Sequence, residues 1–81
     1  MRDIVSISFD KVHWRIARYT PVFRNGQWVY TKRDCRAKPR KWCRIAEWDA
    51  KAYAAKHGIP FVNGVMHGAK VTNSHPDYAQ H

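Results

Sequence analysis

One segment of the chain, residues 32–44, concentrates the side chains best suited to bind phosphate. It carries a single acid among a run of cations, which are Lys32, Arg33, Arg36, Lys38, Arg40, Lys41 and Arg44. A guanidinium group can bind a phosphate through two parallel hydrogen bonds, and a lysine supplies a mobile point charge. We therefore expect this segment to contact the phosphates of a polyanion, with nucleic acid as the first candidate.

The net charge of the chain supports this expectation. The 81 residues include 15 Lys and Arg against six Asp and Glu, which gives a net charge of +9. Residues 45–81 contain equal numbers of acidic and basic residues, so the whole excess lies in residues 1–44. Like charges in one region repel each other and destabilise the compact state, and an anionic partner relieves that repulsion. The alternative is that the charge serves solubility alone.

Aromatic residues alternate with cations on one side of the predicted strands. The second group of candidate binding residues consists of Arg15, Tyr19, Trp28 and Tyr30. Unpaired bases stack on such rings while cations meet the phosphates. A competing interpretation is that the helix or residues 59–66 cover these rings, which would make them part of a two-sided core.

The remaining reactive residues predict neither a metal site nor catalysis. Seven residues lie between Cys35 and Cys43, and the chain has no Cys-x₂-Cys or His-x₃-His pair, so we expect no metal and no cofactor. The sequence is compatible with a disulfide between the two cysteines and also with two unreacted thiols. The carboxylates are scattered and no glycine-rich phosphate loop is present, so we expect no enzymatic activity.

Two hairpins are predicted for the first part of the chain. Period-two alternation predicts strands over residues 3–10 and 12–20, with a tight turn at Asp10-Lys11 that pairs Phe9 with Val12. The apolar residues of these strands are Val5, Ile7, Phe9, Val12, Trp14 and Ile16. Asn25-Gly26 predicts a type I′ turn because both of its residues tolerate positive φ. This turn pairs Phe23 with Trp28 and starts a third strand, which ends near Lys32.

A helix is predicted from about residue 40 to 57, between Pro39 and Gly58. Its apolar stripe consists of Trp42, Ile45, Trp48, Ala52 and Ala55, and we expect this stripe to pack on the sheet face that contains Val5 and Ile16. If Trp48 lies in that core, Trp48→Ala should lower the free energy of unfolding by about 3–5 kcal/mol.

The predicted fold class is α+β, with a small antiparallel sheet packed against one helix. The sheet is a three-stranded meander plus a short C-terminal hairpin or strand around Asn63-Gly64. One domain is expected over residues 1–72, followed by a flexible tail over residues 73–81. This order resembles the layout of DNA-binding modules that insert strands into the major groove, a likeness of layout that names no family.

These observations predict a small, basic, non-enzymatic protein that binds DNA or RNA in the cytoplasm. No apolar run approaches the roughly 20 residues that cross a membrane. The alternative is a phage- or mobile-element-type inhibitor or adaptor, such as an anti-CRISPR or other anti-defence protein, which binds a host protein complex at its nucleic-acid or acidic surface. Capture of a small nucleotide in a basic, aromatic pocket is a third possibility. The sequence does not determine the oligomeric state.

Overall fold

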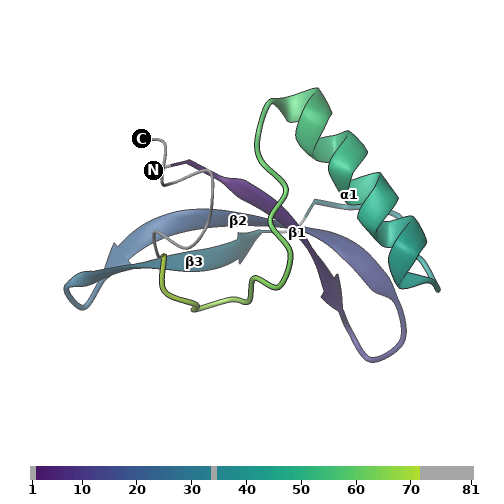
Figure 1. Cartoon of the computed structure of the whole chain (residues 1–81). Helices are drawn as coiled ribbons and strands as arrows, with labels where there is room; N and C mark the ends of the chain where they lie inside the picture. The colour runs from purple at the N-terminus through teal and green to yellow at the C-terminus, as the bar shows by residue number, and fades with distance from the viewer. Residues whose placement is uncertain (1, 34, 72–81) are drawn as a thin grey trace.

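The computed structural model describes residues 2–33 and 35–71, which contain three strands followed by one helix. Strands β1 (Ile4–Phe9), β2 (Trp14–Arg24) and β3 (Gln27–Arg33) form an antiparallel sheet in the order β1-β2-β3, and α1 (Cys43–His57) packs against β1 and β2 (Figure 1). The predicted α+β fold class is confirmed. The tail predicted over residues 73–81 lies outside the described residues.

The hairpin between β2 and β3 has the predicted register. Phe23 pairs with Trp28 and Arg24 with Gln27 across the turn. Asn25 and Gly26 have φ values of 50° and 78°, as the two central positions of a type I′ turn require. This part of the chain is therefore determined by its local sequence.

The hairpin between β1 and β2 has a longer loop than predicted. Phe9 pairs with Trp14, so the predicted pairing with Val12 is wrong. The carboxylate of Asp10 explains the difference, because its Oδ1 accepts hydrogen bonds from the backbone N–H groups of Val12 (2.9 Å) and His13 (2.7 Å). Such a side-chain cap closes a four-residue loop where no glycine is present to form a two-residue turn. The shift is an even number of residues, so the apolar sets still share one face of the sheet.

The helix buries a different stripe from the one predicted. It spans Cys43–His57, so it begins three residues later than predicted, and Gly58 forms its left-handed cap with a φ of 65°. Its buried residues are Ala46, Ala50 and Ala54, which pack against Val5 and Ile7. Side chains four residues apart share one side of a helix, and alanines let that side approach the sheet closely. The predicted packing of the stripe that contains Trp42 and Trp48 is therefore wrong.

The opposite face of the sheet is covered by residues 59–71, which cross it from the β1 edge to the β3 edge (Figure 1). In place of the predicted C-terminal hairpin, this segment forms single β-bridges, from Phe61 to β1 and from Lys70 to β3. Val62 and Val65 are buried with four residues of the sheet, which are Ile4, Ala17, Tyr19 and Tyr30. The sheet therefore has a small core on each side, and the second core decides which aromatic residues remain accessible.

Candidate nucleic-acid interface

Every carboxylate in the described part of the chain is used in an ion pair. The four pairs are Arg15–Asp10 (3.2 Å), Arg18–Asp3 (2.7 Å), Arg40–Asp49 (2.6 Å) and Lys51–Glu47 (3.1 Å). The fold thus neutralises four cations internally and leaves no described acid to balance the others. Any further carboxylate partner for the described cations must come from the part of the chain outside residues 2–33 and 35–71, or from another molecule.

Most of the cations predicted to bind phosphate are exposed. Arg33, Lys38, Lys41 and Arg44 all lie at the surface and form no ion pair with a described carboxylate. Arg36 is also exposed and has a backbone φ of 51°. Lys41 places its Nζ 6.0 Å from the centre of the Trp42 ring. Arg33, Lys38, Lys41 and Arg44 are therefore able to meet an anion without breaking an ion pair with a described carboxylate.

Arg40 has a structural role that sequence analysis did not predict. Its Nε donates a hydrogen bond to Oδ2 of Asp49, and its backbone N–H and C=O both pair with Trp14. The guanidinium expected to contact phosphate therefore joins the segment before α1 to the helix itself. Reversing its charge would place two carboxylates together, so Arg40 is a poor probe of binding.

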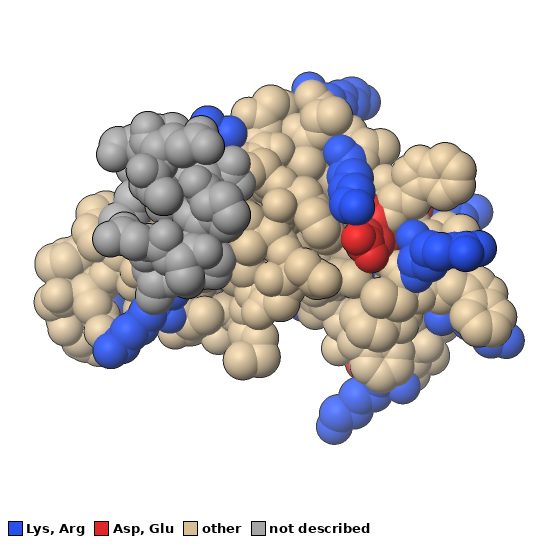
Figure 2. All heavy atoms as spheres, viewed as in Figure 1, with Lys and Arg blue, Asp and Glu red and all other residues tan. Residues whose placement is uncertain are grey.

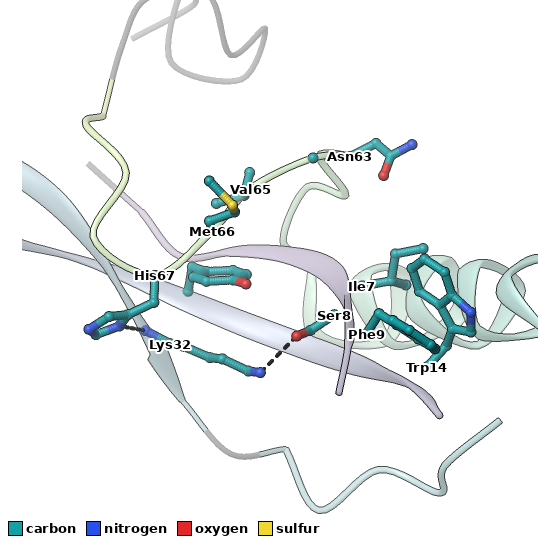
Figure 3. Close-up of a pocket in the computed structure, with 11 residues that line it drawn as sticks. Ile7, Ser8, Phe9, Trp14, Lys32, Asn63, Val65, Met66 and His67 are labelled. Carbon is teal, nitrogen blue, oxygen red and sulfur yellow. Dashed lines mark hydrogen bonds between the residues drawn. The ribbon is translucent and has the colours of Figure 1, made fainter. Parts of the chain in front are cut away.

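Lys32 lies on the sheet face opposite α1, on the same side as its pairing partner Tyr19. Figure 3 shows its side chain extended along a cleft of about 540 Å³, where its Nζ donates a hydrogen bond to Oγ of Ser8 (2.8 Å). Its backbone N–H donates to Nδ1 of His67 (3.2 Å). Lys32 also lines a hollow of about 390 Å³ together with Arg15 and Arg33, so three of the predicted binding cations border one hollow.

Two of the four residues in the second candidate group are not accessible. The expectation that Tyr19 and Tyr30 form an exposed platform is wrong, since they are 2% and 0% exposed beneath Val62 and Val65. Burial also raises the pKa of the Tyr19 hydroxyl. In a domain this small, the sheet uses both faces to bury enough apolar surface, and the C-terminal segment supplies the second cover.

The other two residues of that group remain at the surface but at separate places. Arg15 is exposed and paired with Asp10 in the β1–β2 loop. Trp28 is 41% exposed near the tip of the β2–β3 hairpin, where it packs against Phe23 with ring centres 5.5 Å apart. The predicted platform is therefore reduced to an isolated aromatic pair.

The helix presents an aromatic surface that sequence analysis assigned to the core. Trp42 and Trp48 are 67% and 72% exposed. They border two adjoining hollows of about 390 and 500 Å³, which share Arg44 and Ile45. We call this surface the outer face of α1 and define it by Trp42, Arg44, Ile45, Trp48 and Lys51. The sequence contains one signal that would have identified this surface, the second helical stripe of Ala46, Ala50 and Ala54, which competes with the tryptophan stripe for the sheet.

On the face drawn in Figure 2, the basic side chains do not merge into one patch. Figure 2 shows Lys and Arg side chains separated from one another over the visible face, more numerous on the side where Figure 1 places α1. The charge asymmetry of the sequence is thus only partly preserved in space.

The thiols and the other potential ligands remain separate. Cys35 and Cys43 are both free, and Cys43 is exposed. Within residues 2–33 and 35–71, no group of three or more His, Cys, Asp or Glu side chains is arranged to hold a metal ion. No helix of the described chain has the length and apolar character needed to cross a membrane.

No protein-family model matches the chain, and comparisons with curated proteins and with solved structures found no match.

Proposed function

We propose that this protein is a small, non-enzymatic nucleic-acid-binding protein that contacts phosphates through the exposed cations before and within the first turn of α1. These cations are Arg33, Arg36, Lys38, Lys41 and Arg44. The observation that carries the proposal is that Lys41 and Arg44, which are exposed and have no described carboxylate partner, lie next to the exposed Trp42 and Trp48. We place the protein in the cytoplasm, where free thiols such as Cys35 and Cys43 stay reduced.

The physical basis of the proposal is counterion release. A polyanion such as DNA or RNA carries condensed cations, and each phosphate that a protein neutralises frees some of them. A chain with a net charge of +9, whose described acids are already paired, can supply this exchange. Exposed indole rings add stacking energy that does not depend on the base sequence.

Insertion of the sheet into the major groove is not the mode that we propose. That mode needs an exposed sheet face. Here α1 covers part of one face, and residues 59–71 cover much of the other. The parts of the sheet that these segments cover cannot enter a groove.

Binding across a salt series tests the proposal. Labelled single- and double-stranded DNA and RNA are titrated with the protein at about 50 to 200 mM salt, and the logarithm of affinity should fall linearly with the logarithm of salt concentration. The variant Lys41→Glu/Arg44→Glu should bind at least about tenfold more weakly and show a shallower slope. The matched control is Lys56→Glu/Lys70→Glu, which makes the same charge change at exposed sites elsewhere. Absence of binding at low salt, or a flat slope, would refute the proposal.

The exposed tryptophans also favour the second function, an inhibitor or adaptor of the phage or mobile-element type. Tryptophan and arginine are enriched among the residues that dominate protein–protein binding energy, and Trp48 lies beside Arg44. The partner would be an acidic surface on a host complex, as an anti-CRISPR or other anti-defence protein requires. A pull-down repeated after nuclease digestion separates the two functions. The inhibitor function is supported if a defined protein partner stays bound after digestion and if this chain binds no isolated nucleic acid.

A further inference from the structure

The outer face of α1 is an aromatic surface that the fold itself does not use. Trp48 is 72% exposed and Trp42 is 67% exposed, and neither side chain belongs to the two cores of the sheet. Ala46, Ala50 and Ala54 face the sheet, so Trp48 projects to the opposite side of the helix. A single exposed apolar side chain is ordinary, but Trp42 and Trp48 border two hollows that share Ile45, and a contiguous apolar surface of this kind marks an interaction site.

Cations flank the Trp48 ring along the helix. Arg44 precedes Trp48 by four residues and Lys51 follows it by three, so both lie on the same side of the helix. Lys51 is paired with Glu47 at 3.1 Å, whereas Arg44 has no carboxylate partner in the described part of the chain. The surroundings of the ring therefore carry net positive charge, which favours an occupant that is both flat and anionic.

The two hollows on this surface suggest how such an occupant is arranged. Trp42 borders one hollow and Trp48 the other, and Arg44 lines both. Residues 42 and 48 are separated by about 9 Å along the helix axis. Stacked neighbouring bases are only about 3.4 Å apart. Two neighbouring bases can therefore occupy both hollows only when they are unstacked from each other.

We propose that the outer face of α1 binds single-stranded nucleic acid, with bases stacked on Trp42 and Trp48 and the phosphate between them on Arg44. This inference rests on the proposed function and names its substrate class. Single strands can separate their bases without breaking base pairs, and their bases stack on aromatic side chains. A second copy of the chain is a poorer occupant, because a two-fold contact would bring the two Arg44 side chains close together.

Single-residue variants on this face test the inference. Affinity for an oligothymidine of about ten nucleotides and for a duplex of the same length is measured by fluorescence anisotropy at one salt concentration. Trp48→Ala should weaken single-strand binding by about 5- to 150-fold, while Trp48→Phe should retain most of the affinity because a phenyl ring still stacks. The control is Trp28→Ala, which removes another exposed indole and should change affinity less than about twofold. Circular dichroism confirms that each variant is folded.

The outcomes separate failure of the inference from failure of the proposed function. If Lys41→Glu/Arg44→Glu abolishes binding while Trp42→Ala/Trp48→Ala leaves single-strand affinity unchanged, the stacking inference is overturned and the phosphate contacts stand. Equal affinity for duplex and single strand also overturns it. If neither nucleic acid binds at low salt, both proposals fail. If Trp48→Ala instead abolishes self-association in sedimentation, or a nuclease-resistant complex with a purified acidic protein, and leaves oligothymidine affinity unchanged, the face is a protein interface and the inference is wrong.

Discussion

Arg40 and Asp49 are joined by a hydrogen-bonded ion pair, with Nε of Arg40 2.6 Å from Oδ2 of Asp49. The backbone of Arg40 is also fixed to the start of β2 through two hydrogen bonds with Trp14, of 2.7 and 2.8 Å. This one residue connects the segment before α1 to both the sheet and the helix. The exposed cations on either side of it, Lys38 and Lys41, are therefore attached to a firmly positioned backbone.

The coupling between Arg40 and Asp49 is measurable. Both side chains are about one-third exposed, so solvent screens the pair, and we expect it to contribute about 0.5–1 kcal/mol to the free energy of unfolding. Arg40→Ala, Asp49→Ala and the double variant are compared by urea denaturation in a double-mutant cycle. The pair Lys51–Glu47, which spans one helical turn, is the reference and should show weaker coupling. A coupling energy of zero for Arg40 and Asp49 would contradict the structural role given to Arg40.

The exposed location of Trp48 predicts a small effect of Trp48→Ala on stability, whereas a core location would predict a large one. Because its side chain is mostly exposed, Trp48→Ala should change the free energy of unfolding by less than about 0.5 kcal/mol. Tyr30→Ala, which empties a fully buried site, should lower it by about 3–5 kcal/mol. Denaturant unfolding of both variants compares the two sites directly. A large loss for Trp48→Ala would show that the helix packs through its tryptophans.

The alanine face of α1 is tested by enlarging its side chains. Ala50 is fully buried between the helix and the sheet, so Ala50→Leu should destabilise the protein by about 1–3 kcal/mol through overpacking. Ala52→Leu adds the same atoms at an exposed position and should have an effect below about 0.5 kcal/mol. Thermal unfolding measures both. If Ala52→Leu proved the more harmful variant, the orientation of the helix would have to be reversed.

Asp10 makes the β1–β2 loop sensitive to acid. Hydrogen bonds from the backbone N–H groups of His13 and Val12 lower the pKa of the Asp10 carboxyl below its ordinary value of 3.8. The unfolded chain therefore takes up the proton more readily than the folded protein does. The stabilisation from charged Asp10 is present above the ordinary pKa and is lost as the pH falls through the lowered one.

The variant Asp10→Asn isolates this effect, because the amide oxygen still accepts a hydrogen bond while the charge is absent. The difference in melting temperature between the wild type and Asp10→Asn should be constant above about pH 5 and should shrink as the pH falls below 3.8. Thermal unfolding from acid to neutral pH provides the measurement. A difference that does not depend on pH would show that the carboxylate charge is unimportant to the loop.

The candidate site could be predicted only in part. The cations of residues 32–44 were recognised from their density, and several of them are exposed as phosphate binding requires. The aromatic residues were assigned to the wrong sides, since Tyr19 and Tyr30 are buried and Trp48 is exposed. An apolar residue repeated at helical or strand spacing shows that a face exists, but it does not show what covers that face. The sequence of α1 contains two stripes that could pack on the sheet, one of alanines and one with tryptophans. The prediction chose the stripe with the larger side chains.

The amino-acid sequence by itself determined the features that depend on near neighbours, namely the order of strands and helix, the Asn25-Gly26 turn, the end of the helix at Gly58 and the excess of positive charge. Tertiary structure alone decided which side of α1 meets the sheet and that residues 59–71 cover Tyr19 and Tyr30. It also decided that Arg40 pairs with Asp49. Turns and caps depend on the φ and ψ preferences of a few adjacent residues. The burial of a face depends on how closely two distant segments approach, and the small alanine side chains allow the closer contact.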